Sequence, residues 1–237
     1  MAQARVPDPL RAVLLDAGDT ILGPYPSFAG RFMAVAEGEG ERFEQAAVEA
    51  ALAEAVREAD WPAAWDDPAI SRTFWEGLYD GVLARLGHDP AERARLTRAM
   101  FEAFSDPRAY RLLPGAREVL DTLAGHGLTL GIVSNFEPWL LDILELQGVR
   151  GMFATTAVSG VLGVAKPDPA IFAAALAEAG VTAAEAVHVG DSPTADVAGA
   201  LAAGVTPILL DPAGRPAPAG ALAISALDQL PGLLGLT

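Results

Sequence analysis

The sequence predicts an α/β fold, in which a parallel sheet has helices on both faces and carries an inserted domain made only of helices. Two observations support this prediction. In the second half of the chain, short runs of leucine, valine and isoleucine alternate with helical segments, a pattern typical of the βαβ units that build a parallel sheet. Between the first apolar run and these later ones, a long stretch shows helical periodicity alone.

The composition indicates a folded protein and excludes several kinds of function. Of the 237 residues, 51% are hydrophobic and 20% are charged, which suits a packed core and not a disordered chain. The net charge of -15 argues against nucleic acid or an anionic membrane as a partner. Cysteine is absent, so disulfides, thiolate metal sites and cysteine nucleophiles are excluded.

Targeting signals are also missing from the sequence. Residues 1–10 have no apolar core of the kind found in a signal peptide, and no apolar run approaches the ~20 residues needed to span a bilayer. We therefore expect a cytoplasmic protein with a small-molecule substrate and with no nucleic-acid or membrane partner. Nothing in the sequence indicates the oligomeric state.

The first predicted strand ends at an aspartate. Residues 12–15 are a continuous apolar run that leads into Asp16, as expected for a parallel strand buried on both faces. In open α/β sheets the chemistry lies just beyond the carboxyl ends of the strands. Asp16 is therefore a candidate nucleophile, metal ligand or both, and the alternative is an ordinary turn aspartate.

The insertion is expected to contain four helices between residues 28 and 105. Apolar residues recur three or four positions apart in one group at Phe74, Leu78, Val82 and Leu86, and in another at residues 43, 47, 50 and 51. We assign residues 24–107 to a helical cap and residues 1–23 and 108–237 to the α/β core. The aromatic residues of the insertion either fill its core or line a ligand cavity: Trp61, Trp65, Phe74 and Trp75.

The remaining elements complete a Rossmann-like parallel sheet. Further strands are expected at residues 128–133, 153–159, 186–189 and 206–210. Between them, helices are expected at 113–123, 137–147, 168–180 and 193–203. The tail after Asp211 is rich in proline, glycine and alanine, and we expect it to pack loosely through residues 227–234 alone.

Polar side chains stand at the carboxyl ends of several of these strands: Asp16, Ser134, Lys166, Asp191 and Asp196. Each alone could belong to a turn, a solvated loop or a helix cap. Together, two carboxylates at one sheet edge favour a hard divalent cation with oxygen ligands, Mg²⁺ first. Lys166 is the single lysine of the chain, and its charge would balance an anionic substrate.

Four segments carry a resemblance to the haloacid dehalogenase-like (HAD) hydrolase superfamily. They read Leu-Leu-Asp-Ala-Gly-Asp-Thr at 14–20, Ile-Val-Ser-Asn at 132–135, Ala-Lys-Pro-Asp-Pro-Ala-Ile-Phe at 165–172 and Val-Gly-Asp-Ser-Pro-Thr-Ala-Asp at 189–196. They occur in the family's order, and the insertion stands where the family has its helical, C1-type cap. Residues 131–196 look closest to the subgroup called haloacid dehalogenase-like hydrolase domain-containing protein 3.

This resemblance implies a Mg²⁺-dependent hydrolase, in the first place a phosphatase acting on a small phosphorylated metabolite. Asp16 would attack phosphorus and form an aspartyl phosphate, which divides one difficult displacement into two easier ones. The Mg²⁺ ligands implied are Asp16, the backbone carbonyl of Gly18, and Asp191.

The resemblance also implies how the phosphoryl group is held. Ser134, Asn135 and Lys166 would bind its oxygens, with Lys166 acting as a compact positive charge. Asp196 would orient the loop or a metal-bound water without touching the substrate.

One position departs from the family's phosphatases, which carry Asp-x-Asp in the first segment. Gly18 occupies the place of the second aspartate, and Asp19 follows one position later. The missing carboxylate would protonate the leaving oxygen and activate the attacking water, work that contributes roughly 10²–10⁴-fold to a rate. Asp19 either replaces it as a catalytic residue or serves only in the turn.

Two alternatives to a phosphatase remain open. Haloacid dehalogenases also lack the second aspartate, because a departing halide needs no proton, and they resemble this chain at Asp16-Ala17 and Ser134-Asn135. They need no metal, however, and carry no aspartate at the place of Asp191, which favours the phosphatase. The other alternative is a binding module that kept the fold without catalysis.

Overall fold

The computed structural model describes residues 4–61 and 67–236. The chain forms two compact units. The described part of the first, here called the core unit, comprises residues 4–23 and 112–236, and that of the second, the helical unit, comprises residues 24–61 and 67–111. The chain thus leaves the core unit after its first strand and returns to it after a block of helices.

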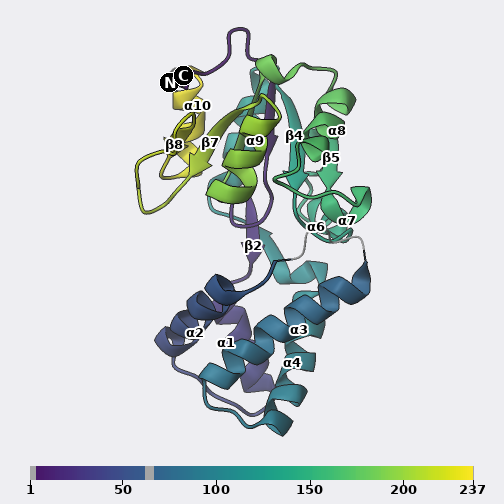
Figure 1. The fold of residues 1–237 in the computed structure, drawn as a ribbon, viewed down its shortest axis with the longest axis vertical. Helices are drawn as coiled ribbons and strands as arrows, with labels where there is room; N and C mark the ends of the chain where they lie inside the picture. The colour runs from purple at the N-terminus through teal and green to yellow at the C-terminus, as the bar shows by residue number, and fades with distance from the viewer. Residues whose placement is uncertain (1–3, 62–66, 237) are drawn as a thin grey trace. The chain divides into compact units, whose positions relative to one another are not determined.

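The core unit is built on a six-stranded sheet (Figure 1). The strands lie in the order β5-β4-β1-β6-β7-β8, and each neighbouring pair is parallel. Their bounds are β1 Ala12–Leu15, β4 Thr129–Ser134, β5 Phe153–Val158, β6 Ala186–Gly190, β7 Thr206–Leu210 and β8 Leu222–Ile224. The predicted parallel sheet is confirmed.

Strand β1 is central and buried along its whole length. Side chains alternate between the two faces of a strand. Ala12 and Leu14 pack into the apolar cluster that includes Phe172 of helix α8 (Pro169–Ala179) and Ala200 of helix α9 (Ala198–Ala202). Val13 and Leu15 therefore face the opposite layer. Because both faces are covered, the strand reads as an unbroken apolar run.

Helices cover both faces of this sheet. Helix α8 packs on β4 and β5 and contacts α9, and both are seen over the sheet in Figure 1. Helix α5 (Ala116–Gly125) packs on β4 and contacts α10 (Leu230–Leu233). Helix α5 leads to β4, on one side of β1, whereas α8 and α9 lead to β6 and β7, on the other side. Because the crossovers are right-handed, α5 lies on one face of the sheet, and α8 and α9 lie on the other. The short helices α6 (Leu140–Leu146) and α7 (Ser159–Leu162) follow β4 and β5.

The predicted boundaries of α8 are confirmed by its caps. Asp168 accepts a hydrogen bond from the backbone N–H of Ala170 at 2.9 Å, Pro169 occupies the first turn, and Gly180 ends the helix in the left-handed region. Other boundaries differ. The helix expected at 193–203 begins as a π-helical turn, Pro193–Val197, before α9, and the helix expected from residue 137 begins at 140.

The prediction of a loosely packed tail is wrong. Residues 222–224 form β8, which extends the sheet beyond β7, and the backbone N–H of Asp211 donates to the carbonyl of Ile224 at 2.9 Å. Three residues are too few to show periodicity in a sequence. For the same reason, the two-stranded sheet of β2 (Leu22–Pro24) and β3 (Tyr110–Leu112), where the chain passes between its units, was not predicted.

The described residues of the helical unit form the four helices expected from the sequence: α1 Phe28–Gly38, α2 Gln45–Glu58, α3 Pro68–Arg85 and α4 Pro90–Phe104. Leu78 and Val82 of α3 are buried as predicted. On α2, however, Val48, Ala51 and Ala55 form the buried face, while residues 47 and 50 are exposed. The predicted buried face of α2 is therefore partly wrong. Alanine occurs on both faces of that helix, so its spacing does not show which face is buried.

Of the aromatic residues of the helical unit, one packs in its core and another lines a cavity. Trp75 packs against the unit's core, whereas Trp61 is exposed and its ring lies 4.8 Å from that of Phe74. Phe74 lines a cavity between α2 and α3. Trp65 lies outside the described residues. In the described ranges, no helix has the length and apolar character needed to cross a membrane.

Candidate functional site

The predicted polar residues meet at the point in the sheet where the connections between strands run off in opposite directions. From β1 the chain continues to β4 on one side, and from β6 it continues to β7 on the other. At such a switch point the loops leave in opposite directions and open a crevice at the carboxyl edge of the sheet. Asp16 directly follows β1, Ser134 ends β4, and Asp191 directly follows β6.

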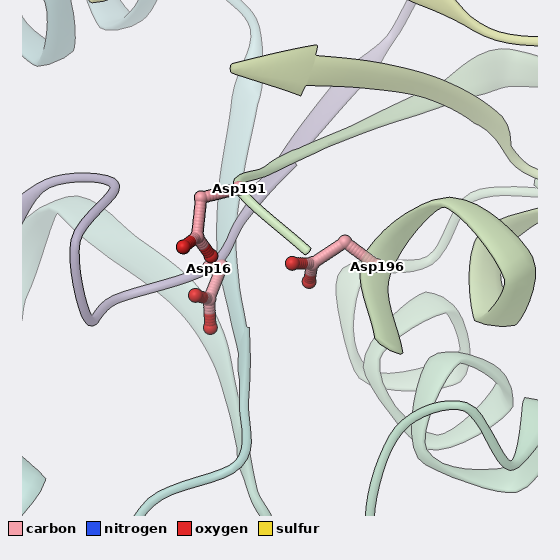
Figure 2. Close-up of side chains that lie close together, drawn as sticks. All are labelled: Asp16, Asp191 and Asp196. Carbon is pink, nitrogen blue, oxygen red and sulfur yellow. The ribbon is translucent and has the colours of Figure 1, made fainter. Parts of the chain in front are cut away.

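Three aspartates converge at this edge. Figure 2 shows the carboxyl groups of Asp16 and Asp191 beside each other, with that of Asp196 turned toward them from the segment after β6. One oxygen atom from each of the three lies within 4.8 Å of the others. Asp16 and Asp196 are buried, whereas Asp191 is exposed.

Lys166 lies between two of these carboxylates. Its Nζ atom is 2.7 Å from Oδ1 of Asp16 and 2.6 Å from Oδ1 of Asp196, and the side chain is buried. Burial alone would lower the pKa of Lys166, but the negative charges of Asp16 and Asp196 outweigh it and raise the pKa. Lys166 is therefore an ammonium ion at neutral pH.

Asn135 holds Lys166 in place through the backbone. Its Nδ2 donates to the carbonyl of Lys166 at 2.9 Å, and its Oδ1 accepts the backbone N–H of Lys166 at 2.7 Å. Both ends of the amide are thus engaged by one residue of the chain. The predicted contact of Asn135 with a phosphoryl group stays a prediction.

Asp16 is the buried carboxyl at the centre of the arrangement. It accepts hydrogen bonds from Lys166 and from the Ser134 side chain. Burial raises its pKa above the usual range, and the charge of Asp196 adds to this rise, while Lys166 and Ser134 oppose it. An added positive charge at the site would therefore favour the ionised, nucleophilic form of Asp16.

Both carboxyl oxygens of Asp196 accept hydrogen bonds from within the chain. Its Oδ1 receives Lys166 Nζ and His188 Nε2, at 2.6 and 2.8 Å, and its Oδ2 receives the backbone N–H of Ser192 at 2.9 Å. Burial would raise its pKa, but Lys166 and His188 outweigh burial and hold the pKa well below the usual range. Asp196 is thus a carboxylate whose contacts suit positioning better than direct metal binding.

Gly190 leaves the space that the Asp196 carboxyl occupies. A Cβ atom at residue 190 would lie 2.2 Å from Cγ of Asp196. We expect Gly190→Ala to reduce the free energy of unfolding by about 1–3 kcal/mol, because the side chain must shift in a packed interior. Activity should fall as Asp196 is displaced. Urea unfolding and steady-state turnover measure the two effects.

The matched control for that substitution is Gly125→Ala at the end of α5. A Cβ atom at Gly125 meets nothing within 4 Å, so this variant should lose no stability and no activity. Equal stability of the two variants would show that the Asp196 carboxyl is not confined by the backbone of β6.

Asp191 carries the clearest sign of uncompensated negative charge. Its pKa is raised to about 7, first by burial of its carboxyl, although the residue as a whole is exposed, and then by the charges of Asp16, Asp196 and Asp19. Three carboxylates thus face the single ammonium of Lys166. Because Asp196 already accepts three hydrogen bonds within the chain, Asp16 and Asp191 are the better placed of the three carboxylates to hold a cation. An all-oxygen pair of this kind fits Mg²⁺.

This surplus charge predicts a pH-dependent stability. Because the folded-state pKa of Asp191 lies above its unfolded value of 3.8, the metal-free folded protein binds more protons than the unfolded chain between these two pH values. Its contribution to stability is complete below the unfolded pKa and is lost as pH rises through about 7. Thermal unfolding in EDTA should therefore show a falling midpoint from pH 5 to pH 8.

Mg²⁺ should reverse this loss at pH 8. A ligand that binds only the folded state at a hundredfold excess over its Kd adds about 2.7 kcal/mol. The variant Asp191→Asn should be more stable than the natural protein in EDTA at pH 8 and should gain nothing from Mg²⁺. An equal gain from Mg²⁺ in both proteins would place the cation elsewhere.

Gly18 and Asp19 lie in the turn after β1. Gly18 avoids the left-handed region, and a Cβ atom there meets nothing within 4 Å. Asp19 has φ +52°, and its backbone N–H donates to the carbonyl of Leu22 at 2.9 Å. Burial of its carboxyl and the nearby Asp16 charge raise its pKa, although the residue as a whole is exposed. Asp19 thus lies close enough to Asp16 for the two charges to interact.

Five residues of the site were predicted from the sequence, and two others were not. The structure brings together Asp16, Ser134, Lys166, Asp191 and Asp196, as the sequence predicts for side chains at strand ends. The predicted role of the Gly18 carbonyl as a ligand stays a prediction. His188 and Gly190 were not singled out. A histidine inside an apolar strand was the available signal for the first, and the second had none.

Comparison with known proteins agrees with this geometry. The sequence profile of the haloacid dehalogenase-like hydrolases matches residues 10–204. The chain is 32% identical over 207 residues to haloacid dehalogenase-like hydrolase domain-containing protein 3 of Danio rerio, and the match covers 86% of each protein. It is 38% identical over 155 residues to phosphoserine phosphatase of Thermus thermophilus, covering 65% of this chain and 59% of the phosphatase.

Solved structures give the same result. The crystal structure of a 2-haloacid dehalogenase from Pseudomonas syringae pv. Tomato DC3000 is similar over 95% of this chain and 98% of that one, with 28% identity and a TM-score of 0.60. The family resemblance carried by the four segments, including the subgroup, is confirmed. The chain belongs to the haloacid dehalogenase-like hydrolases and is itself a hydrolase.

Proposed function

We propose that this hydrolase is a Mg²⁺-dependent phosphatase that acts on a small phosphorylated metabolite through an aspartyl-phosphate intermediate. The observation that carries the proposal is the environment of Asp16. Its buried carboxyl is hydrogen-bonded by Lys166 and Ser134 and lies beside Asp191, whose pKa is raised first by burial and then by the negative charges of the neighbouring carboxylates. The named phosphatase among the relatives points the same way.

In this proposal the residues of the site divide the work of the reaction. An oxygen of Asp16 forms the bond to phosphorus, and the leaving oxygen departs with the electron pair of the broken P–O bond. Water then attacks the aspartyl phosphate and releases inorganic phosphate and the Asp16 carboxylate. Lys166 and the Ser134 hydroxyl stabilise the charge on the phosphoryl oxygens.

Asp16, the Gly18 carbonyl and Asp191 would hold the cation. When bound, Mg²⁺ supplies positive charge that neutralises the transferring phosphoryl group. Asp196 keeps Lys166 aligned from the other side. Asn135 acts as a positioning residue, because its amide fixes the backbone of Lys166. The helical unit, whose described residues are 24–61 and 67–111, is proposed as the cap that determines the substrate.

The absence of a carboxyl side chain at Gly18 bears on the substrate. Without an acid to protonate it, the leaving oxygen must depart as an anion, so esters of acidic leaving groups should react faster than alkyl esters. Steady-state rates in Mg²⁺ across aryl, acyl and alkyl phosphates test this. We expect turnover to rise steeply as the pKa of the leaving group falls and to disappear in EDTA. A flat dependence, or activity that survives the chelator, contradicts the proposal.

A 2-haloacid dehalogenase is the second candidate, favoured by Gly18 and by the similarity to a dehalogenase structure. In that reaction Asp16 would displace halide from carbon, and the departing halide would need no proton. Halide release from a 2-haloacid in EDTA would establish this activity.

A further inference from the structure

His188 is a polar residue in an apolar part of the core unit. It lies in the middle of β6 with no exposed surface, and its ring is edge-on to that of Phe172, with 4.9 Å between the ring centroids. Its Nδ1 atom is buried and has no hydrogen-bond partner among the described residues. An apolar side chain would avoid this unpaired atom, so packing alone does not explain a histidine at this place.

The other ring nitrogen connects His188 to the site. Nε2 is 2.8 Å from Oδ1 of Asp196, and the same oxygen receives Nζ of Lys166 at 2.6 Å. Lys166 in turn reaches Asp16 at 2.7 Å. Because Asp196 is a carboxylate and can only accept, Nε2 carries a proton and donates it to Asp196. An unbroken series of buried polar contacts thus runs from His188 on β6 to Asp16, directly after β1.

We propose that His188 is a positioning residue for the reaction of Asp16, acting through Asp196 on the Lys166 ammonium. The expected effect on kcat rests on the phosphatase function proposed above. The expected effect on the position of Lys166 does not. The hydrogen bond of His188 goes to Asp196 and not to Asp16, so His188 acts through other residues and is not itself a catalytic residue.

The carboxylates of Asp16 and Asp196 compete for the ammonium group of Lys166. Lys166 is shared between Asp16 and Asp196. The N–H of His188 takes up part of the negative charge on the Asp196 oxygen that faces Lys166, and it also fixes the orientation of that carboxyl. Without this hydrogen bond, Asp196 draws Lys166 toward itself, and less positive charge is available to Asp16 and to the phosphoryl oxygens as the reaction proceeds.

The kinetic test compares His188→Leu with His188→Gln. Leucine keeps an apolar contact with Phe172 and removes the donor, whereas glutamine keeps an N–H near the position of Nε2. We expect His188→Leu to lower kcat by about tenfold, as is usual when a partner of a site residue is removed, and to change KM by less than about twofold. His188→Gln should restore kcat to within about threefold of the natural protein. In an Asp196→Asn background, His188→Leu should have no further effect on kcat.

A spectroscopic readout does not depend on activity. Because Lys166 is the single lysine of the chain, protein labelled with ¹³C-lysine gives one side-chain Cε signal, which reports the surroundings of this ammonium. We expect His188→Leu to shift that signal and His188→Gln to shift it less. The control His126→Leu changes an exposed histidine at the end of α5 and should leave it in place.

The outcomes separate this inference from the proposed function. An unmoved Lys166 signal in His188→Leu, or a glutamine variant no better than leucine in kcat, overturns the positioning role. A shifted signal in a protein without phosphatase activity supports the positioning role and refutes the proposed function. If neither variant folds, the ¹⁵N shifts of His188 in the natural protein decide, since a proton on Nδ1 in place of Nε2 would contradict the inference.

Discussion

Gly18→Asp is expected to raise the turnover of alkyl phosphate monoesters by about 10²–10⁴-fold, the usual contribution of a general acid–base residue. The turn can accept the new side chain, because Gly18 avoids the left-handed region and a Cβ atom there meets nothing within 4 Å. In the phosphatases of this family an aspartate occupies this position. The gain should be largest for poor leaving groups and small for aryl phosphates, which leave without a proton.

Two further variants control this experiment. Gly18→Asn adds a side chain of the same shape without an acid and should produce no gain. Asp19→Asn tests the neighbour, whose carboxyl lies near enough to Asp16 for the two charges to interact. If Gly18→Asp gains nothing while Asp19→Asn lowers turnover by about 10²-fold, then Asp19 already serves as the acid.

Asp16→Asn is expected to abolish phosphatase activity, with a loss of about 10⁴-fold or more, since removing a nucleophile removes the covalent route. The variant should stay folded, because asparagine fills the same volume and the surplus of negative charge at the site decreases. Turnover of the best phosphate substrate, with circular dichroism as the check on folding, measures this. No phosphorylated protein should accumulate in the variant.

The control for that loss is Asp142→Asn, which changes an exposed aspartate in the first turn of α6. It should keep full activity. If Asp16→Asn retains activity comparable to this control, Asp16 is not the nucleophile and the aspartyl-phosphate route is wrong.

Most of the core unit could be predicted because its elements have strong local signals. Strand β7 (Thr206–Leu210) and helix α8 (Pro169–Ala179) occupy the residues expected, the first as a bounded apolar run and the second between an aspartate cap and a terminal glycine. The elements that escaped prediction include the three-residue strands β2, β3 and β8. They exist because a neighbouring strand supplies hydrogen-bond partners, which the local sequence does not report.

The candidate site, too, was predictable in part from local sequence and depends in part on tertiary contacts. The sequence by itself determined which side chains follow each strand, and parallel strands bring their carboxyl ends to one edge, so Asp16, Ser134 and Asp191 were expected to lie together. The identity of Lys166 as the balancing charge also followed from its being the single lysine.

Only the tertiary structure decided how these atoms meet. Lys166 and Asp16 are 150 positions apart in the chain, and their contact depends on how α8 packs against the sheet. Packing also determined that Asn135 grips the backbone of Lys166, that Gly190 makes room for Asp196, and that His188 directs its N–H toward the same carboxyl. Periodicity reports which face a residue occupies, whereas hydrogen bonds depend on a few tenths of an ångström, which only the folded chain determines.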